Sequence, residues 1–392
     1  MGRKPHYGEG SVFERKDGRY EAVVPNFGGT GKRKSFYGKT KTEARKKRDE
    51  ALKQLARGEY VDVSKMKTAE YLDYWESVHG PTIELVSWQR YKSYIRLYFK
   101  PAFGHVPLQK LTTQDIQHMY DALAKEGIKA KKGLKASTLQ SIHIPLNGAL
   151  EYAVRLGKIA KNPCDNVKLP KVKKREYPLL TKGQAHLIIE QSEHRLDDRF
   201  VFHSQRQIGA IVLLLITTGI RIGEALSLHW SDIDFDKKIL LVDTTLSYDT
   251  ENHVRFEADP KSQSSEREIA LSQLAIKALS AHRINQIEAR LEAPEWEDHD
   301  LVFTNKKGGH TWDSLVRTQL KSFLGHFRLP DIKPHDLRHN VSTALIAAGT
   351  PMKTVQALLG HTKIATTMDL YGHVSPEMKQ SAADDIDQIF GG

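Results

Sequence analysis

The chain has 392 residues, of which 39% are hydrophobic and 27% are charged, and its formal net charge at pH 7 is +11. This length corresponds to two to four domains, at roughly 100–200 residues per domain. Cys164 is the single cysteine, which excludes an intramolecular disulfide and favours a reducing compartment. No apolar run approaches the roughly 18 residues of a membrane span, and the N-terminus lacks the apolar segment of a signal peptide. We therefore expect a cytoplasmic protein without a membrane partner.

The positive charge is concentrated in the first half of the chain. Residues 1–60 contain 16 Lys and Arg against 8 Asp and Glu, and residues 61–175 contain 20 against 10. Residues 176–392 carry 23 against 30 and are therefore acidic. Each Lys or Arg placed on a phosphate releases counterions and adds affinity that does not depend on sequence. The distribution predicts that the first half binds a polyanion; a charged surface that serves only solubility is the alternative.

Residues 1–60 predict a small three-stranded sheet with one helix. Strand-like segments at 11–16 and 19–24 flank an Asp-Gly turn, which is a strong hairpin signal. A third strand is expected at 32–37, followed by a helix that begins with a capping box at Thr40. The strands would present a basic face to a DNA groove, with Arg15, Lys16, Arg19, Lys32, Arg33 and Lys34 as the expected contacts.

Residues 61–170 predict a domain built only of helices. Aromatic and aliphatic residues recur at helical spacing from Tyr71 and again from Trp88, and a capping box at Thr112 begins a third helix. Such a stripe is typical of a hydrophobic core, so we expect the aromatic rings to be buried rather than stacked on bases. Basic residues between them, and a basic linker at 171–178, would contact DNA phosphates. These expected contacts are Lys92, Arg96, Lys131, Lys132, Lys173 and Lys174.

Residues 179–392 predict an α+β domain. Helices are expected at 182–190 and 208–228, and helices return in the last part of the chain. Between them lie short strand candidates at 239–242, 254–257 and 267–271. Runs of helices around a few short strands indicate a mainly helical domain with a small antiparallel sheet.

Five spaced motifs in this last domain carry residues suited to chemistry on a phosphodiester. In chain order they contain Arg221 with Glu224, Lys261 at the tip of a predicted β-turn, His335 with Asp336 and Arg338, His361, and Tyr371. This order of Arg, Lys, His-x-x-Arg, His and Tyr resembles the tyrosine recombinase (phage integrase) family, and the likeness covers all of 176–392. Residues 61–170 look like the helical, SAM-like core-binding domain of that family. Residues 1–60 look like the arm-binding domain of integrases from temperate phages and conjugative transposons.

The resemblance implies that the protein cuts and rejoins DNA through a 3′-phosphotyrosine. Tyr371 would be the nucleophile and His335 the base that helps it, because a tyrosine hydroxyl has a pKa of about 10. Lys261 would be the general acid that protonates the leaving 5′-oxygen. Arg221 and Arg338 would bind the nonbridging oxygens, since planar, permanently charged guanidinium groups match them best.

Three further residues would complete this site. His361 would donate another hydrogen bond to the phosphate, and Glu224 and Asp336 would brace the site rather than react. The bond energy stored in the phosphotyrosine means that no ATP, metal or other cofactor is needed. The Gly-Lys pairs near the N-terminus also lack the glycine spacing of a P-loop.

Two alternatives remain open at this point. A metal-dependent nuclease could use His335 and His339, which are four residues apart and would share a helix face. Arg338 would then lie beside the metal, which argues against that site. A DNA-binding regulator with an inactive recombinase domain is the other alternative, and it is disfavoured because all six catalytic positions are present.

The extra N-terminal domain predicts an integrase that integrates and excises a mobile element or prophage in a bacterial host. Its partners would be double-stranded DNA at arm-type and core-type sites, an excisionase and DNA-bending accessory proteins. Residues from Ser375 onward have the N-cap and apolar spacing of a short tail helix. The resemblance implies that this tail docks on a neighbouring protomer and links a homotetramer on DNA.

Overall fold

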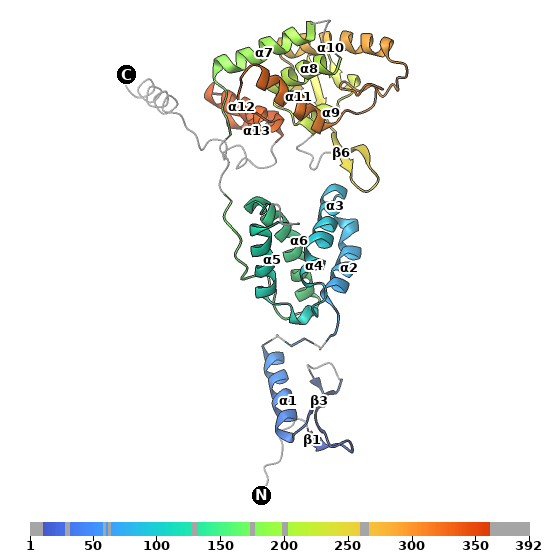
Figure 1. The fold of residues 1–392 in the computed structure, drawn as a ribbon, viewed down its shortest axis with the longest axis vertical. Coiled ribbons are helices and arrows are strands. Elements are labelled where there is room, and N and C mark those ends of the chain that lie inside the picture. Colours follow the sequence, from blue (N-terminus) through green and yellow to red (C-terminus); the bar gives the residue numbers. More distant parts are fainter. Residues whose placement is uncertain are drawn as a thin grey trace, which may run out of the picture. The chain divides into compact units, whose positions relative to one another are not determined.

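The computed structural model describes residues 11–27, 32–57, 60–61, 64–127, 132–172, 177–197, 203–258 and 266–360. The chain divides into two compact units, 1–173 and 174–392 (Figure 1). Within the part of the chain that the structure describes, no helix is long and apolar enough to cross a membrane.

The first unit begins with an antiparallel sheet and a helix (Figure 1). Strands β1 (Ser11–Glu14), β2 (Tyr20–Val24) and β3 (Lys34–Gly38) pair in the order β1-β2-β3, and helix α1 (Lys41–Ala56) covers one face. A small core of Val24, Phe27 and Ala51 joins the sheet to the helix. Thr40 is the N-cap of α1 as the sequence predicts, and its side chain accepts a hydrogen bond from the Glu43 N–H.

The rest of the first unit is helical, which confirms the prediction. The elements are α2 (Thr68–His79), η2 (Gly80–Thr82), α3 (Leu85–Tyr94), the π-turn η3 (Ile95–Phe99), α4 (Lys100–Phe103), η4 (Leu108–Lys110), α5 (Thr113–Lys125) and α6 (Ala136–Arg155). Tyr71 is fully buried and Trp88 is nearly so, so the aromatic stripes form the core. Thr112 and Asp115 form the predicted capping box of α5. The π-turn precedes Pro101, which has no N–H to continue the α-helical ladder.

The second unit is a mainly helical α+β domain, as predicted (Figure 1). Its helices are α7 (Lys182–Asp197), α8 (His203–Thr218), α9 (Ile222–Leu226), η5 (Trp230–Asp232), α10 (Gln273–Glu292), α11 (Asp313–His326), α12 (Pro334–Ala347) and α13 (Met352–Leu359). The apolar segment of α8 is buried in the centre of the core, and α7, α10, α11 and α12 pack around it. This position explains why the longest apolar run of the chain lies in α8.

The strands of the second unit form two separate sheets. Strands β4 (Ile233–Asp234), β5 (Ile239–Val242) and β8 (Arg267–Ala270) pair in the order β4-β5-β8, and β6 (Thr245–Asp249) pairs with β7 (Val254–Ala258). All of these pairings are antiparallel. The sequence predicts β5, β7 and β8 but misses β4 and β6. It also does not separate β7 and β8 into different sheets.

The single helix predicted over 208–228 is wrong. The helix ends at Thr218, and α9 begins after a turn at Gly219, whose φ is +68°. A positive φ cannot continue a right-handed helix, and glycine adopts it without steric cost. This turn brings Arg221 to the start of α9, where its side chain is half exposed.

Candidate active site

The site is built around the N-terminus of α9. Arg221 is the N-cap of this short helix, and its backbone N–H donates to Glu224 Oε2 at 2.8 Å. The Arg221 guanidinium also donates from Nη1 to Glu224 Oε1 at 2.5 Å. The carboxylate of Glu224 is stabilised in the first turn, near the positive end of the helix, and it holds the Arg221 cation at the N-cap.

Arg338 enters the same site from α12, which is distant in the sequence. Arg338 is only 2% exposed, and its Nη1 donates to the Gly219 carbonyl at 2.7 Å. Its Nη2 donates to the Leu359 carbonyl at the end of α13. Burial and the nearby charge of Arg221 lower the pKa of Arg338 to about 9, so the side chain still carries its charge at neutral pH.

Arg267 is a third arginine of this site, and the sequence analysis did not single it out. It is the first residue of β8, and its side chain is 7% exposed. Its Nη2 donates to Glu224 Oε2 at 2.9 Å, and its Nε donates to the Leu358 carbonyl at 2.8 Å. One signal could have found it, because Arg267 alternates with buried Ile269 and so lies on the inner side of the strand.

Glu224 is the single carboxylate among these three arginines in the described part of the site. It is 5% exposed, and burial alone would raise its pKa. The hydrogen bond from Arg267 and the charges of Arg267 and Arg221 outweigh burial and lower the pKa. Three guanidinium groups against one carboxylate leave a surplus of positive charge, which suits a phosphodiester.

His335 and Asp336 lie in the first turn of α12, just before Arg338. His335 is exposed, and its ring packs edge-on against His339 with centroids 4.6 Å apart. Asp336 is 1% exposed, and its Oδ2 accepts from the Lys333 N–H at 3.0 Å, so it fixes the start of the helix. The residues that the structure describes contain no group of three or more His, Cys, Asp or Glu side chains placed to hold a metal ion.

The other three predicted catalytic residues lie outside the described residues. Lys261 belongs to the connection between β7 and β8, and Tyr371 lies beyond the end of α13. His361 directly follows Gly360, the left-handed C-cap of α13. The structure therefore gives no side-chain position for Lys261, His361 or Tyr371.

The sequence matches the phage integrase family over residues 178–378, and the N-terminal SAM-like domain of phage integrases over residues 69–124. A tyrosine recombinase XerC-like protein of Caldanaerobacter subterraneus subsp. tengcongensis is 30% identical over 372 residues, which cover 91% of this chain and 92% of the relative. The chain belongs to the phage integrase family. It is a tyrosine recombinase of the mobile-element integrase type, an enzyme that breaks and rejoins DNA.

Two solved structures share the fold of this recombinase. The Tn1549 transposon integrase in complex with a circular intermediate DNA has a TM-score of 0.68 at 19% identity, and the match covers 82% of this chain and 99% of that chain. The lambda integrase tetramer bound to a Holliday junction has a TM-score of 0.55 at 19% identity, covering 94% of this chain and 96% of that one. At these identities the likeness concerns the fold.

The sheet of the recombinase's first unit has an outer face, opposite α1, that combines aromatic and charged side chains. Phe13, Glu21 and Tyr37 lie opposite one another on β1, β2 and β3. Phe13 is 44% exposed and Tyr37 is 43% exposed, whereas Glu21 is 4% exposed. Arg15 donates to Glu21 at 3.0 Å, and Arg33 lies 3.6 Å from the same carboxylate.

The predicted DNA contacts of the recombinase therefore fall into three groups. Arg15 and Arg33 pair with Glu21, and Arg19 pairs with Asp17 at 2.8 Å. The others that the structure describes are exposed, or partly so, in the first unit: Lys16, Lys32, Lys34, Lys92, Arg96 and Lys132. Lys131, Lys173 and Lys174 lie outside the described residues.

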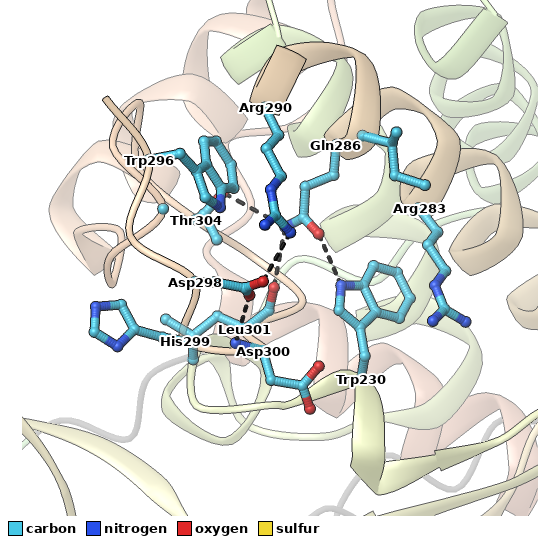
Figure 2. A pocket seen from close by; sticks show the side chains of 12 residues that line it. Trp230, Arg283, Gln286, Arg290, Trp296, Asp298, His299, Asp300, Leu301 and Thr304 are labelled. Carbon is cyan, nitrogen blue, oxygen red and sulfur yellow. Dashed lines mark hydrogen bonds and ion pairs between the residues drawn. The ribbon is translucent and has the colours of Figure 1, made fainter. Parts of the chain in front are cut away.

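A pocket beside α10 is separate from the arginine site (Figure 2). Arg290 pairs with Asp298 at 2.7 Å across it, and Trp230 Nε1 donates to Gln286 at 2.7 Å. Arg283 lies over the Trp230 ring, 5.2 Å from its centroid. No described residue among the predicted catalytic set lines this pocket, so we do not assign the recombinase reaction to it.

Proposed function

We propose that this recombinase integrates and excises a mobile element, a prophage or a conjugative transposon, by way of a 3′-phosphotyrosine on Tyr371. One observation carries the proposal. Arg221 and Arg338 come from distant parts of the chain and donate to the consecutive carbonyls of Gly360 and Leu359. The next residue along the chain is His361, and this neighbourhood supports a role for His361 beside the two arginines in binding one phosphate.

The arginines would stabilise the charge that develops during cleavage. The pentavalent transition state carries more negative charge on its nonbridging oxygens than the ground state does. Arg221 and Arg338 would donate to these oxygens, and His361 would add a further hydrogen bond. Because the two guanidinium groups are already oriented by the chain, little reorganisation is needed when the charge develops.

The proton transfers would involve the remaining residues. His335 would accept the proton of the Tyr371 hydroxyl as its oxygen attacks the phosphorus. The bond from phosphorus to the 5′-oxygen would break, and Lys261 would protonate that oxygen. The reverse attack by a 5′-hydroxyl of a second DNA strand would rejoin the DNA and release the tyrosine. Glu224 and Asp336 would hold Arg221 and the start of α12 in place.

The domain roles are part of the same proposal. Residues 1–60 would bind arm-type sites, 61–170 would bind the core-type site, and 171–178 would follow the backbone into the catalytic domain at 179–392. The protein would act as a homotetramer in the cytoplasm of a bacterial host, with its tails exchanged between protomers. An excisionase and DNA-bending proteins would set the direction of the reaction.

The test uses a duplex that carries the element's core-type site with a nick beside the scissile phosphate. The short fragment released on cleavage diffuses away, so the covalent complex accumulates. We expect a covalent protein–3′-phosphate complex with the full chain, and none with Tyr371→Phe, which should still bind the duplex. Tyr248→Phe, an exchange of the same kind on β6, is the control that should cleave normally.

Three other results would contradict the proposal. Covalent trapping of Tyr371→Phe would place the nucleophile at another residue. Loss of cleavage in a chelator would favour the metal-dependent nuclease. Binding without any cleavage by the unmodified chain would favour the regulator with an inactive recombinase domain.

A further inference from the structure

Three consecutive carbonyls at the end of α13 each accept a hydrogen bond from a different arginine. Arg267 Nε donates to the Leu358 carbonyl at 2.8 Å, and Arg338 donates to the Leu359 carbonyl. Arg221 Nη2 donates to the Gly360 carbonyl at 3.3 Å. The last carbonyls of a helix have no partner within the helix and carry partial negative charge, so cations are stabilising there.

Arg267 differs from Arg221 because each of its guanidinium nitrogens donates to a group of the chain. Its Nη2 and Nη1 donate to the two oxygens of Glu224 at 2.9 and 3.4 Å, while Nε donates to Leu358. Its side chain is 7% exposed, against 38% for Arg221. All three guanidinium nitrogens of Arg267 therefore donate within the chain, which suits a role in holding the site together.

The contacts of Arg267 connect the parts that orient the phosphate-binding arginines. Glu224 holds both the backbone and the guanidinium of Arg221. The end of α13 holds Arg338 and Arg221 through its carbonyls. Arg267 fixes the carboxylate and this helix end relative to each other, across 43 and 91 residues of sequence.

We propose that Arg267 is a positioning residue that sets the direction of the Arg221 and Arg338 guanidinium groups toward the scissile phosphate. The proposal rests on the proposed recombinase function. Without Arg267, Glu224 keeps Arg221 alone as its cationic partner and can draw that guanidinium away from the substrate. Lysine cannot replace Arg267 fully, because an ammonium group lacks the planar fork that reaches a carboxylate and a carbonyl at once.

The test compares two scissile groups in the nicked core-site duplex. One is the natural phosphate, and the other is a methylphosphonate, in which a methyl group replaces one nonbridging oxygen and removes the negative charge. On the phosphate we expect Arg267→Gln to form the covalent complex roughly 10²-fold more slowly than the unmodified chain. On the methylphosphonate the ratio of the two rates should approach one, because there is less charge for misdirected arginines to stabilise. On the phosphate, the rate for Arg267→Lys should lie between the rates for the unmodified chain and Arg267→Gln.

Arg206→Gln is the matched control. Arg206 is also a buried arginine of the second unit, and its Nη1 donates to Asn285 and Glu288, each at 3.1 Å, outside the site. This variant should lower the melting temperature and leave the cleavage rate of the folded protein unchanged on both substrates. If Arg267→Gln is too unstable to assay, Arg267→Lys is measured on the same two duplexes and should show the same relief.

A loss that is equally large on the phosphate and the methylphosphonate would overturn the proposal, because a merely structural defect does not depend on substrate charge. An equal cleavage loss in Arg206→Gln would also overturn it. Failure of the unmodified chain to form any covalent complex would instead refute the proposed function.

Discussion

At the scale of single residues, Glu224 determines how the positive charges of the site are arranged. Its buried carboxylate accepts hydrogen bonds from Arg221 and Arg267 on both oxygens. A buried charge of this kind is tolerated only when it is paired and hydrogen-bonded. The ion pairs of Glu224 with Arg221 and Arg267 therefore stabilise the fold only while Glu224 is ionised.

Glu224→Gln should destabilise the protein in a pH-dependent way. The arginines lower the pKa of the folded carboxyl below its ordinary value of 4.5. The stabilisation is therefore present above that ordinary value and is lost as the pH falls through the lowered one. At pH 7 we expect the free energy of unfolding of the variant to be about 3 kcal/mol lower, because the charges of two arginines lose their partner. Thermal melting of the unmodified chain and of Glu224→Gln at several pH values measures the difference in their stability. This difference should become smaller at acid pH.

Glu268→Gln is the control for this prediction, because Glu268 is exposed on the same strand as Arg267. It should melt like the unmodified chain at every pH. A Glu224→Gln difference that stays constant from neutral to acid pH would show that the charge of Glu224 contributes nothing.

At the scale of secondary-structure elements, the turn between α8 and α9 decides where the arginines meet. Gly219 has a φ of +68°, and a Cβ added there would lie 2.8 Å from Leu359 Cδ2. Its carbonyl also accepts from Arg338. The absence of a side chain therefore lets the turn, α12 and the end of α13 approach closely enough to share hydrogen bonds.

Gly219→Ala should lower both stability and cleavage. The backbone strain costs roughly 1–2 kcal/mol, and the methyl group must push Leu359 away. Displacement of Leu359 would disturb its hydrogen bond with Arg338, so the covalent complex should form at least about tenfold more slowly. Thermal melting and the nicked-duplex assay measure the two effects.

Gly349→Ala separates backbone strain from steric crowding. Gly349 has a φ of +80°, but an added Cβ would meet nothing within 4 Å. Gly349→Ala should lose the same stability to backbone strain as Gly219→Ala, and so melt at a lower temperature than the unmodified chain. It should cleave normally when folded. If both variants cleave equally slowly, the close approach at Gly219 does not matter for the site.

At the scale of the whole molecule, the charge is divided between regions with different proposed tasks. Residues 1–60 carry a net charge of +8, whereas 176–392 carry −7. Part of the positive charge of residues 1–60 is already paired within the structure. Glu21 pairs with Arg15 and Arg33, and Asp17 pairs with Arg19. These arginines would contribute to DNA affinity only as far as they exchange these partners for phosphates or bases.

Deletion of residues 1–60 should weaken binding to arm-type DNA while cleavage of an isolated core-type site survives. The slope of log affinity against log salt concentration should become shallower, by about 0.9 for each DNA phosphate that the shortened protein no longer neutralises. Filter binding at a series of salt concentrations measures the slope, and the nicked duplex measures cleavage. Loss of core-site cleavage in a deletion protein that melts cooperatively would contradict the separation of tasks.

The sequence alone predicted those features that depend on neighbours along the chain. Helix starts at Thr40 and Thr112, the Asp-Gly hairpin turn and the aromatic core stripes follow from local hydrogen bonding and periodicity. The order of the five motifs was also sufficient to identify the family, because that order is itself a property of the sequence.

Only the tertiary structure decided which distant groups meet. Arg267 contacts Glu224 and Leu358 across 43 and 91 residues of sequence, and no local pattern encodes those distances. The break at Gly219 overrides a continuous helical periodicity because α13 packs against that turn. In the same way, β8 pairs with the distant strand β5, whereas β7, its neighbour along the chain, pairs with β6 in a local hairpin. Local interactions specified the elements and the pair of Arg221 with Glu224, whereas long-range packing brought Arg267 and Arg338 to the same site.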